Sequence, residues 1–460
     1  MSDSVSLLST VHFSQMGQWD VKQFFLDIIR SSYAVEELGK HIVHETKKIQ
    51  LSDWPEDEFV ILGVSNKIGM FDASIEKGKR LRQKYHVVED GWLAYNPYRI
   101  NVGSIGVKTA ELEGGYISPA YVVFSCKETL LPEFLWLLMK SGQFSAVINA
   151  STTGSVRQTL RFDKLAKIKV PIPTVEEQKI ILAEYNSVLA NAEKCMSDAD
   201  RFSDGLLLEI QSMVSDLEME NLAPEVGSSI MQVVPFTATR RWEVGYIRKQ
   251  GRLDEVCASF TCPSYSIDEL QTESLFGLSV KASSTKQVDM IPVLRMTNIV
   301  NGEIDTTELK YLPRMCATTA KEPDKWLLKD GDFLVTRTNG SKDLVGKSAV
   351  FHEDGAYTYA SYLIRYRFNA LMVLPDYVNI LFLTPLVREQ IAVMRRQGGG
   401  QYNLNSEEIG SIKIPVPSIQ EQREIIERYH LAKGATSVFY NEANQLRRRA
   451  LADFEKNIFA

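Results

Sequence analysis

The chain repeats a segment of itself, and this repeat constrains its fold more than any other feature. IKVPIPTVEEQKIILAEY begins at Ile168, and IKIPVPSIQEQREIIERY begins at Ile412. The two align without a gap over eighteen positions at an offset of 244 residues. Looser similarity extends upstream, where LPEFLWLL begins at Leu131 and LPDYVNIL at Leu374. The agreement indicates an internal duplication in which each half has a variable globular part followed by a better-matched tail.

The two tails predict long helices. Apolar or small residues recur mostly at alternating steps of four and three, which is typical of a coiled-coil seam with one stutter. A single buried amphipathic helix gives a similar pattern, but two matched helices in one chain most simply pack on each other. Thr174 and Ser418 are the expected N-caps, because the prolines before them cannot lie inside a helix. The expected seam residues are Ile181, Tyr185, Val188, Ala192, Cys195, Ala199, Phe202, Leu206, Ile210, Met213 and Leu217, and then Ile425, Tyr429, Ala432, Thr436, Phe439, Ala443, Leu446, Ala450 and Phe454.

The globular parts mix strand-like and helical patterns. Helical patterns cover residues 132–148 and 375–394, and residues 221–250 have the Pro, Gly and Ser content of a linker. Each half is therefore expected to hold an α+β domain. Runs rich in β-branched and aromatic residues predict strands at Phe59–Val64, Tyr121–Phe124, Asp332–Thr336, Ser348–Phe351 and Leu363–Phe368.

Composition narrows the class of protein. With 460 residues, 44% hydrophobic and 24% charged, the chain is long enough for two or more domains with cores of their own. Neither a membrane span nor a signal peptide is expected, and five scattered cysteines suit reduced thiols in the cytoplasm. No metal site is expected, since Cys257 and Cys262 lack the spacing and the second pair of a zinc site. The net charge of −6 argues weakly against indiscriminate nucleic-acid binding.

With these tails, the chain resembles the specificity subunits of type I restriction–modification systems (the HsdS family). The second half carries the most recognisable motifs: VLRMTNIVNGEID from Val293, LKDGDFLVTRTNGSKDLVGKSAVF from Leu328 and QYNLNSEEIGSIKIPVPSIQEQ from Gln401. The first half resembles a divergent member and lacks the usual GDxL and RNGS motifs.

The resemblance implies an α+β fold in which two mixed α/β target-recognition domains alternate with two long antiparallel coiled-coil helices in a pseudo-twofold internal repeat. Each domain would read half of a bipartite target in double-stranded DNA. Two methyltransferase (modification) subunits and two restriction/translocase subunits would be the partners, and they would hold S-adenosylmethionine, ATP and Mg²⁺. This chain would bind no cofactor and would itself be non-catalytic. The expected parts are the first recognition domain at 1–173, the first helix at 174–220, the linker at 221–250, the second recognition domain at 251–417 and the second helix at 418–460.

Reading bases requires amide and guanidinium groups on loops that enter the major groove, whereas phosphate contacts need cations and backbone N–H groups. Two loops are candidates, although the second-half loop could be a plain Asn-Gly turn with solvated charges. The second-half loop offers Arg337, Thr338, Asn339, Ser341 and Lys342, and the first-half loop offers Asn96, Tyr98, Arg99, Asn101 and Ser104.

A second pair of candidates precedes the proline tails, where glycine lets the backbone approach a phosphate closely. A flexible connector would have the same composition, and both interpretations stay open. These segments offer Arg157 and Gln158 in the first half, and Arg396, Gln397, Gln401 and Asn403 in the second.

Three patterns suggest catalysis or metal binding but are incomplete. Residues 96–98 lack one proline of the adenine methyltransferase motif, and Gly340 and Gly346 are one residue too far apart for a phosphate-binding loop. His41 and His44 could share one helix face, yet no further ligands accompany them. Two alternatives to the specificity subunit remain. One is a duplicated protein scaffold that does not read DNA, and the other is a diverged stand-alone DNA methyltransferase or nuclease.

Overall fold

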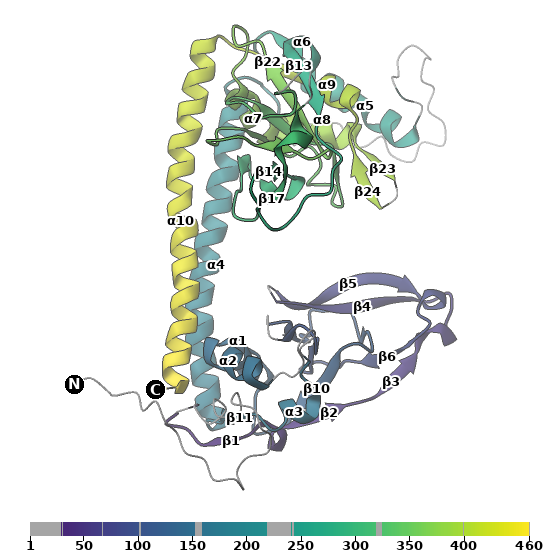
Figure 1. The fold of residues 1–460 in the computed structure, drawn as a ribbon, viewed down its shortest axis with the longest axis vertical. Coiled ribbons are helices and arrows are strands. Elements are labelled where there is room, and N and C mark those ends of the chain that lie inside the picture. The colour runs from purple at the N-terminus through teal and green to yellow at the C-terminus, as the bar shows by residue number, and fades with distance from the viewer. Residues whose placement is uncertain are drawn as a thin grey trace, which may run out of the picture. The chain divides into compact units, whose positions relative to one another are not determined.

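The computed structural model divides the chain into two compact units (Figure 1). Unit 1 comprises Met1–Cys195 and Asn441–Ala460, and unit 2 comprises Met196–Tyr440. Helices α4 (Val175–Ser212) and α10 (Ile419–Phe459) each contribute residues to both units. The residues that the structure describes are 29, 31–66, 68–100, 103–151, 159–218, 241, 243–318, 324–398 and 400–459.

Unit 1 is a mixed α+β unit with three sheets. A four-stranded sheet has the order β2-β10-β7-β8, a five-stranded sheet has the order β3-β6-β9-β4-β5, and β1 pairs with β11. Its elements are β1 Val35–Glu37, β2 Ile42–Glu45, β3 Lys48–Gln50, β4 Glu58–Ser65, β5 Gly69–Lys77, β6 Lys84–Val87, β7 Leu93–Tyr95, β8 Ile105–Val107, β9 Tyr116–Ile117, β10 Val122–Cys126, α1 Pro132–Lys140, α2 Gly142–Ser151, α3 Phe162–Leu165 and β11 Lys169–Pro171, followed by α4.

Unit 2 has the same order of pairings in its main sheet. Strands β13-β22-β18-β20 form four antiparallel neighbours, just as β2-β10-β7-β8 do in unit 1. Strand β14 pairs with β21 in parallel, as β4 pairs with β9, and β12 pairs with β25, as β1 pairs with β11. The two halves of the chain therefore share a strand topology as well as a tail.

The remaining elements of unit 2 include several short helices and short strands. The elements are α5 Val244–Ala258, β12 Ser264–Ser266, α6 Ile267–Leu270, β13 Gln271–Phe276, β14 Met290–Leu294, β15 Ile299–Val300, β16 Glu303–Ile304, β17 Lys310–Pro313, β18 Phe333–Thr336, β19 Thr338–Asn339, β20 Ser348–Val350, β21 Thr358–Tyr359, β22 Leu363–Phe368, α7 Pro375–Leu383, α8 Pro385–Met394, β23 Arg396–Gly398, β24 Gln401–Asn403, α9 Ser406–Gly410 and β25 Lys413–Pro415, followed by α10.

All five predicted strands are present within one or two residues of their expected bounds, and β22 matches them fully. The two predicted helical stretches, however, each form two helices. They break at Ser141 and Thr384, whose buried hydroxyls donate to Leu138 O and Leu381 O at 2.7 Å. Pro385 follows the second break and has no N–H to continue the helix. The predicted linker also ends early, because residues 244–250 form the first turns of α5, while residues 219–240 lie outside the described part of the chain.

Thr174 and Ser418 cap the two long helices, as predicted, and each forms a full capping box with the glutamate three residues later. Thr174 Oγ1 accepts from Glu177 N at 3.3 Å, and Thr174 N donates to the Glu177 carboxylate at 2.8 Å. Ser418 and Glu421 repeat this exchange at 3.3 and 2.8 Å. Two otherwise unpaired N–H groups are satisfied at each helix start, which stabilises it after the proline turn.

The glutamine after each capping glutamate ties its helix to the globular part. Gln178 is fully buried; its Oε1 accepts from Leu131 N at 2.8 Å, and its Nε2 donates to Thr129 O and Pro173 O. Gln422 in unit 2 makes the three equivalent bonds, to Leu374 N, Met372 O and Pro417 O. This pair of clamps explains in physical terms why the repeated segment carries Glu-Gln at the same place in both halves.

The predicted helix seam is largely buried, with three departures. Phe202, Met213 and Phe439 are 46%, 42% and 38% exposed. Half-buried Ser203 takes the inward position in place of Phe202, so the seam steps by four and then three at this point. A small side chain suits a stretch whose neighbouring seam residue, Ala199, is fully buried.

Helix α4 also ends sooner than predicted, at Ser212 instead of residue 220. Ser215 forms a β-bridge with Phe260, its hydroxyl lies 2.7 Å from that of Ser259, and Val214 enters the core of unit 2. Tertiary contacts with the chain after α5 therefore replace the last predicted turns, and Met213 and Leu217 are not seam residues.

Inside each unit, α4 contacts α10. In unit 1, Asn457 lies 3.4 Å from the Glu184 carboxylate, and the rings of Tyr185 and Phe454 are 6.3 Å apart. In unit 2, Arg428 pairs with Glu209 and Tyr440 with Asp200. In both units, higher residue numbers on one helix meet lower numbers on the other.

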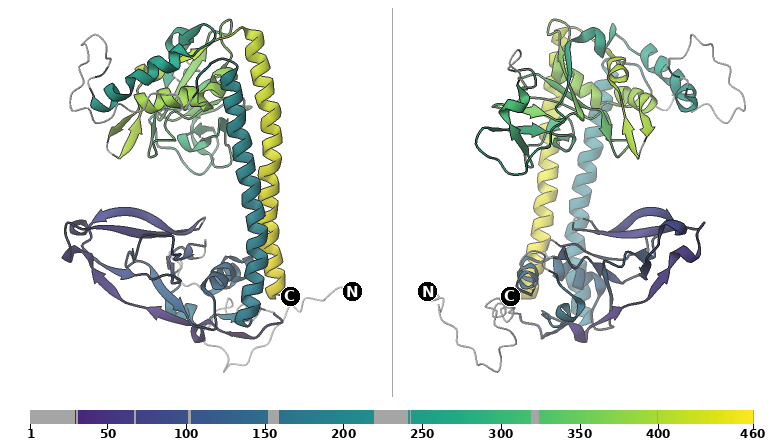
Figure 2. Two further views of the ribbon diagram at one scale, coloured as in Figure 1. Left: turned by 180° about the vertical axis from the view of Figure 1, so that it is seen from behind. Right: turned by 45° about the vertical axis from the view of Figure 1, so that its right-hand side comes forward.

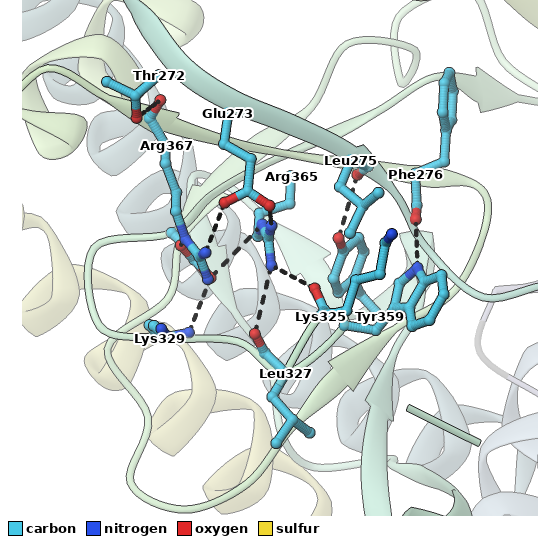
Figure 3. Close-up of polar contacts among 12 residues, drawn as sticks. Thr272, Glu273, Leu275, Phe276, Lys325, Leu327, Lys329, Tyr359, Arg365 and Arg367 are labelled. Atoms are coloured by element: carbon cyan, nitrogen blue, oxygen red, sulfur yellow. Dashed lines mark hydrogen bonds and ion pairs between the residues drawn. The ribbon is translucent and has the colours of Figure 1, made fainter. Parts of the chain in front are cut away.

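A buried ionic network braces the main sheet of unit 2 (Figure 3). Arg365 on β22 is fully buried, pairs with Glu273 on β13 and donates to Lys325 O at 3.1 Å. Arg367 meets buried Asp332 through two nitrogens, at 2.6 and 3.0 Å, and also pairs with Glu273. Because a buried guanidinium is tolerated only when it is paired, these contacts fix the strands and the loop before β18 together.

Among the described residues, no helix combines the length and apolar character that a membrane span requires. Within the same part of the chain, no three His, Cys, Asp or Glu side chains are placed to hold a metal ion. All five cysteines lie in the described part of the chain, and none of them is in a disulfide bond.

Candidate nucleic-acid interface

In unit 2, a small sheet brings together the two segments that the sequence singled out. Strand β19, just after β18, pairs with β24, and β24 pairs with β23. Asn339 and Gln397 both lie opposite Tyr402, while Thr338 and Arg396 both lie opposite Asn403. Residues 338–339, 396–398 and 401–403 therefore form one small sheet, although about sixty residues separate its first strand from the other two in sequence.

The register sorts the candidate side chains onto two faces, because directly paired residues share a face and successive residues alternate. One row consists of Asn339, Tyr402 and Gln397, and we call it the amide face. Asn339 and Tyr402 are half-buried, and Gln397 is exposed. The amide face thus presents two side-chain amides on either side of an aromatic ring.

The opposite face is partly used by the protein itself. Buried Thr338 donates its hydroxyl to Asn403 Oδ1 at 2.7 Å, so these two side chains largely satisfy each other. Arg396 Nε donates to Glu408 on α9 at 2.6 Å, but half of its side chain remains exposed. Gln401, near the tip of the ribbon, is exposed.

The loop from Asn339 to β20 is held by arginines that follow it in sequence. Arg395 Nη1 donates to Lys342 O at 2.9 Å, and Arg388 donates to Asp343 O at 2.9 Å and Val345 O at 3.1 Å. Asn339 Oδ1 accepts from Ser341 N at 3.2 Å, and the Lys342 side chain is exposed. The loop is thus braced through its carbonyl oxygens and leads into a strand, not into the helix of a phosphate-binding loop.

Arg337 lies between the main sheet and this small sheet. Its guanidinium is 5.3 Å from the ring centroid of Phe276, and its backbone donates to Tyr362 O at 3.0 Å. Phe276 and Tyr362 are both exposed large side chains. Sequence reasoning missed these two residues, since nothing in their local sequence distinguishes them. It also left out Arg395 and Tyr402, although both lie in the segment already singled out.

In unit 1, the loop after β7 occupies the equivalent place. Asn96 Oδ1 accepts from Tyr98 N at 3.0 Å, and Asn96 N donates to Ser104 O at 3.1 Å, so Asn96 shapes the turn. Ser104 is buried, with its hydroxyl 3.3 Å from Val64 O. Tyr98, which is 57% exposed, and Arg99 project their side chains outward.

The predicted residues Asn101, Arg157 and Gln158 lie outside the described part of the chain. The residues just after 158 are held against the same loop, because Leu160 N donates to Pro97 O at 3.1 Å and Tyr95 Oη donates to Leu160 O at 3.1 Å. In unit 2, Leu404 N donates to Arg337 O at 2.8 Å. Each unit thus joins its two candidate segments by an equivalent backbone bond.

The two histidines considered as a pair do not share a helix. His41 precedes β2 and its Nδ1 lies 2.8 Å from Thr129 Oγ1, whereas His44 lies on β2 and stacks on Phe162 at 4.3 Å. Burial lowers the pKa of His44, so its imidazole is neutral near pH 7. Both rings have roles in packing unit 1.

Comparison with known proteins identifies the family. The model of the type I restriction modification DNA specificity domain matches residues 97–189 and 273–430, together more than half of the chain. The EcoKI specificity subunit of Escherichia coli K12 is 26% identical over 324 residues, which are 68% of this chain and 60% of that protein. The EcoBI specificity subunit of Escherichia coli is 21% identical over 62% of this chain and 56% of that protein.

The match thus spans less than two thirds of each of these relatives. A solved HsdS subunit from Thermoanaerobacter tengcongensis aligns with 93% of this chain and 97% of its own, at 14% identity and a TM-score of 0.37.

The structure defines a mixed α+β protein whose two units each carry a polar loop at the end of the same strand of the main sheet. The chain belongs to the family of type I restriction–modification specificity subunits. Such subunits are generally non-catalytic.

Proposed function

We propose that this chain is the DNA specificity subunit of a type I restriction–modification complex and reads a bipartite target in double-stranded DNA, one half-site per unit. The observation that supports it most is the repeated arrangement of the candidate loops. In both units the loop leaves the equivalent strand, β7 or β18, and is bonded to the chain segment that precedes the capped helix. One protein with two such surfaces suits a target with two specified parts.

The candidate side chains divide into those that would contact DNA and those that hold the loops in shape. We assign DNA contact in unit 2 to Arg337, Asn339, Ser341, Lys342, Arg396, Gln397 and Gln401, whose amides, hydroxyl and cations suit base edges and phosphates. In unit 1, Tyr98 and Arg99 project toward solvent, and we add Asn101, Arg157 and Gln158 from the sequence. Asn96, Ser104, Thr338 and Asn403 shape the loops by the bonds described above.

We further propose that α4 and α10 form an antiparallel coiled coil and that the two halves are related by a pseudo-twofold axis. The recognition domains would be residues 1–173 and 251–417. Large apolar side chains on the helices remain exposed, which suits the docking of partner proteins. They include Ile180, Leu208, Leu431 and Val438.

Two methyltransferase subunits and two restriction/translocase subunits are the proposed partners, in the cytoplasm. Those partners would hold S-adenosylmethionine, ATP and Mg²⁺, whereas this chain would supply the choice of sequence. Its own contribution is thus to orient DNA through side-chain amides, guanidinium groups and loop backbone.

Sequencing of the methylated adenines in a host that carries the three subunits tests this function. The expected result is a bipartite motif with an unread spacer, which disappears when this gene is deleted and returns on complementation. Salt-dependent, sequence-selective binding by the assembled complex should accompany it. If deletion leaves every methylated motif in place, a scaffold without DNA reading is the better interpretation. If the purified chain alone binds S-adenosylmethionine and methylates DNA, it is a stand-alone enzyme.

A further inference from the structure

We propose that the amide face of unit 2 (Asn339, Tyr402 and Gln397) reads A·T base pairs in the major groove, and that Arg395 is the residue that positions it. This inference rests on the proposed function and deepens it. It adds Tyr402 and Arg395 to the determinants of specificity. It also assigns the candidate residues of one small sheet to different tasks.

The first step is the shape of this part of unit 2. Strands β23 and β24 form an antiparallel ribbon that extends from the body of the unit, seen in yellow-green in Figures 1 and 2. Glycines at 398 and 400 lie at its tip, and the exposed side chains of Arg396, Gln397 and Gln401 line it. The major groove of B-DNA is wide enough to admit a two-stranded β-ribbon.

The second step is the choice of face. The face of Thr338, Asn403 and Arg396 is largely used by the protein, through the Thr338–Asn403 bond and the ion pair between Arg396 and Glu408 on α9, and only the half-exposed Arg396 is left for a phosphate contact. Within the described part of the chain, the exposed Gln397 side chain on the amide face makes no hydrogen bond, and Asn339 uses only its oxygen, to accept from Ser341 N. The amide face therefore keeps donors and acceptors available for a ligand.

The third step is the chemistry of recognition. A side-chain amide forms a bidentate pair with adenine, donating to N7 and accepting from the N6 amino group, and an apolar surface contacts the thymine methyl group. Two amides flanking the Tyr402 ring supply both kinds of contact. Guanine would instead call for a free guanidinium group, whereas the guanidinium that contacts the Tyr402 ring belongs to Arg395.

Arg395 is already occupied within the protein. It donates to Lys342 O at 2.9 Å, and its guanidinium lies 5.7 Å from the ring centroid of Tyr402. One side chain thus ties the loop after Asn339 to the aromatic ring at the centre of the amide face. Arg395 acts through these neighbours and does not contact DNA. Its removal is therefore expected to reduce base selectivity while the small sheet stays folded.

The test uses the assembled methyltransferase complex and its methylated motif. In the double variant Asn339→Ala, Gln397→Ala, discrimination at A·T positions of one half-site should fall about 5- to 150-fold, the range for lost bidentate contacts. Duplexes with 7-deazaadenine at those positions, which lack the N7 acceptor, should bind the unchanged complex less well by a similar factor. They should cause little further loss in the double variant. The half-site read by unit 1 is the internal control.

Arg395 and Arg396 provide a matched pair of variants. Arg395→Ala should reduce base selectivity at the same positions as the double variant, and Arg395→Lys should recover only part of that selectivity. Arg396→Ala should weaken binding to every sequence and leave the letters unchanged. If Arg395→Ala prevents assembly, Arg395→Lys and the 7-deazaadenine duplexes still test the proposal.

Several outcomes overturn the inference. If the double variant specifies the same bases as the unchanged complex, the amide face does not recognise bases. If its affinity falls equally for all DNA sequences, the amide face contacts phosphates instead. Insensitivity of the unchanged complex to 7-deazaadenine would exclude bidentate pairing to adenine. A failure of the proposed function is distinguishable, because the unmodified complex would then produce no bipartite motif at all.

Discussion

Strand β22 of unit 2 and strand β10 of unit 1 hold the same place in sheets of the same order, yet their central residues differ. Arg365 lies opposite Leu334 in β18, and Val123 lies opposite Ala94 in β7. Both Arg365 and Val123 are fully buried. At this position, unit 2 buries paired charges where unit 1 buries apolar side chains. The shared topology therefore does not dictate the chemistry of the core.

The difference extends to the contacts that surround each of these strands. In unit 1, Val123 lies in an apolar cluster with Leu62, Met70 and Ile117, next to Trp92. In unit 2, Arg365 and its acidic partners join β13, β18 and the loop at 325–327. An apolar cluster tolerates small changes in volume, whereas a buried charge that loses its partner is costly.

The largest expected effect follows from breaking the network in unit 2. Arg365→Ala leaves the carbonyl oxygens of Lys325 and Leu327 without their donor and should destabilise unit 2 by roughly 3–5 kcal/mol. Native-state hydrogen exchange measures it as lost protection of β22 amides, with β10 in the same molecule as the reference. Unchanged protection of β22 would mean that the network contributes little to stability.

The two glutamine clamps should be equivalent, in contrast to the two cores. Gln178→Ala and Gln422→Ala each leave buried backbone groups without a hydrogen-bond partner. Each substitution should lower the free energy of unfolding of its own unit by about 1–3 kcal/mol. Protection of the amides of Leu131 and Leu374 against exchange reports each loss. Gln420→Ala, an exposed glutamine in the same first turn as Gln422, is the matched control and should have no effect on Leu374. Unequal losses would show that the two helix starts are supported differently.

The two units can also be compared by the base selectivity that each is expected to contribute. Arg337→Ala with Asn339→Ala should relax one half-site, and Tyr98→Ala with Arg99→Ala the other, each by about 1–3 kcal/mol of discrimination. Methylome sequencing of the two variants measures both half-sites at once. Relaxation of the same half-site by both pairs would contradict the division of labour between the units.

The smallest expected effect concerns pH. His352 lies between Asp330 and Asp376, at 2.7 and 3.0 Å; burial opposes its protonation, but the two carboxylates outweigh burial and raise its pKa. The equivalent turn of unit 1 instead pairs Lys108 with Asp90. Stabilisation by protonated His352 is complete below the unfolded-state pKa of about 6.5 and is lost as pH rises through the higher folded-state value.

Because the His352 side chain is half exposed, this contribution should stay below about 1 kcal/mol. The difference in melting temperature between the unchanged protein and His352→Gln should shrink as pH rises from 6 to 9. A difference that grows over this range would reverse the assigned sign. Lys108→Gln in unit 1 is the control and should show no such trend, because it breaks the ion pair with Asp90 without removing an imidazole.

Much of the fold could be predicted because its signals are local. The capping boxes at Thr174 and Ser418 involve residues three apart, and strand β22 has Ile364, Tyr366 and Phe368 among its six residues. The repeat at an offset of 244 residues made the shared organisation of the halves visible without any coordinates. The two candidate loops of each half were proposed from residue type together with the family resemblance, and their contact with DNA stays a prediction.

The rest depended on partners far away in the sequence. Whether Phe202 or Ser203 faces inward, and whether α4 stops at Ser212, depends on contacts with other helices and with Phe260. Likewise, Asn339 and Gln397 share a face only because both strands pair with Tyr402, and a one-residue shift in register would turn them apart. The sequence by itself determined which residues start helices, form strands and supply polar loops, since those choices are made within a few residues. Only the tertiary structure decided which of these side chains lie next to one another. Strand register and burial depend on contacts between segments that are about sixty or more residues apart in sequence.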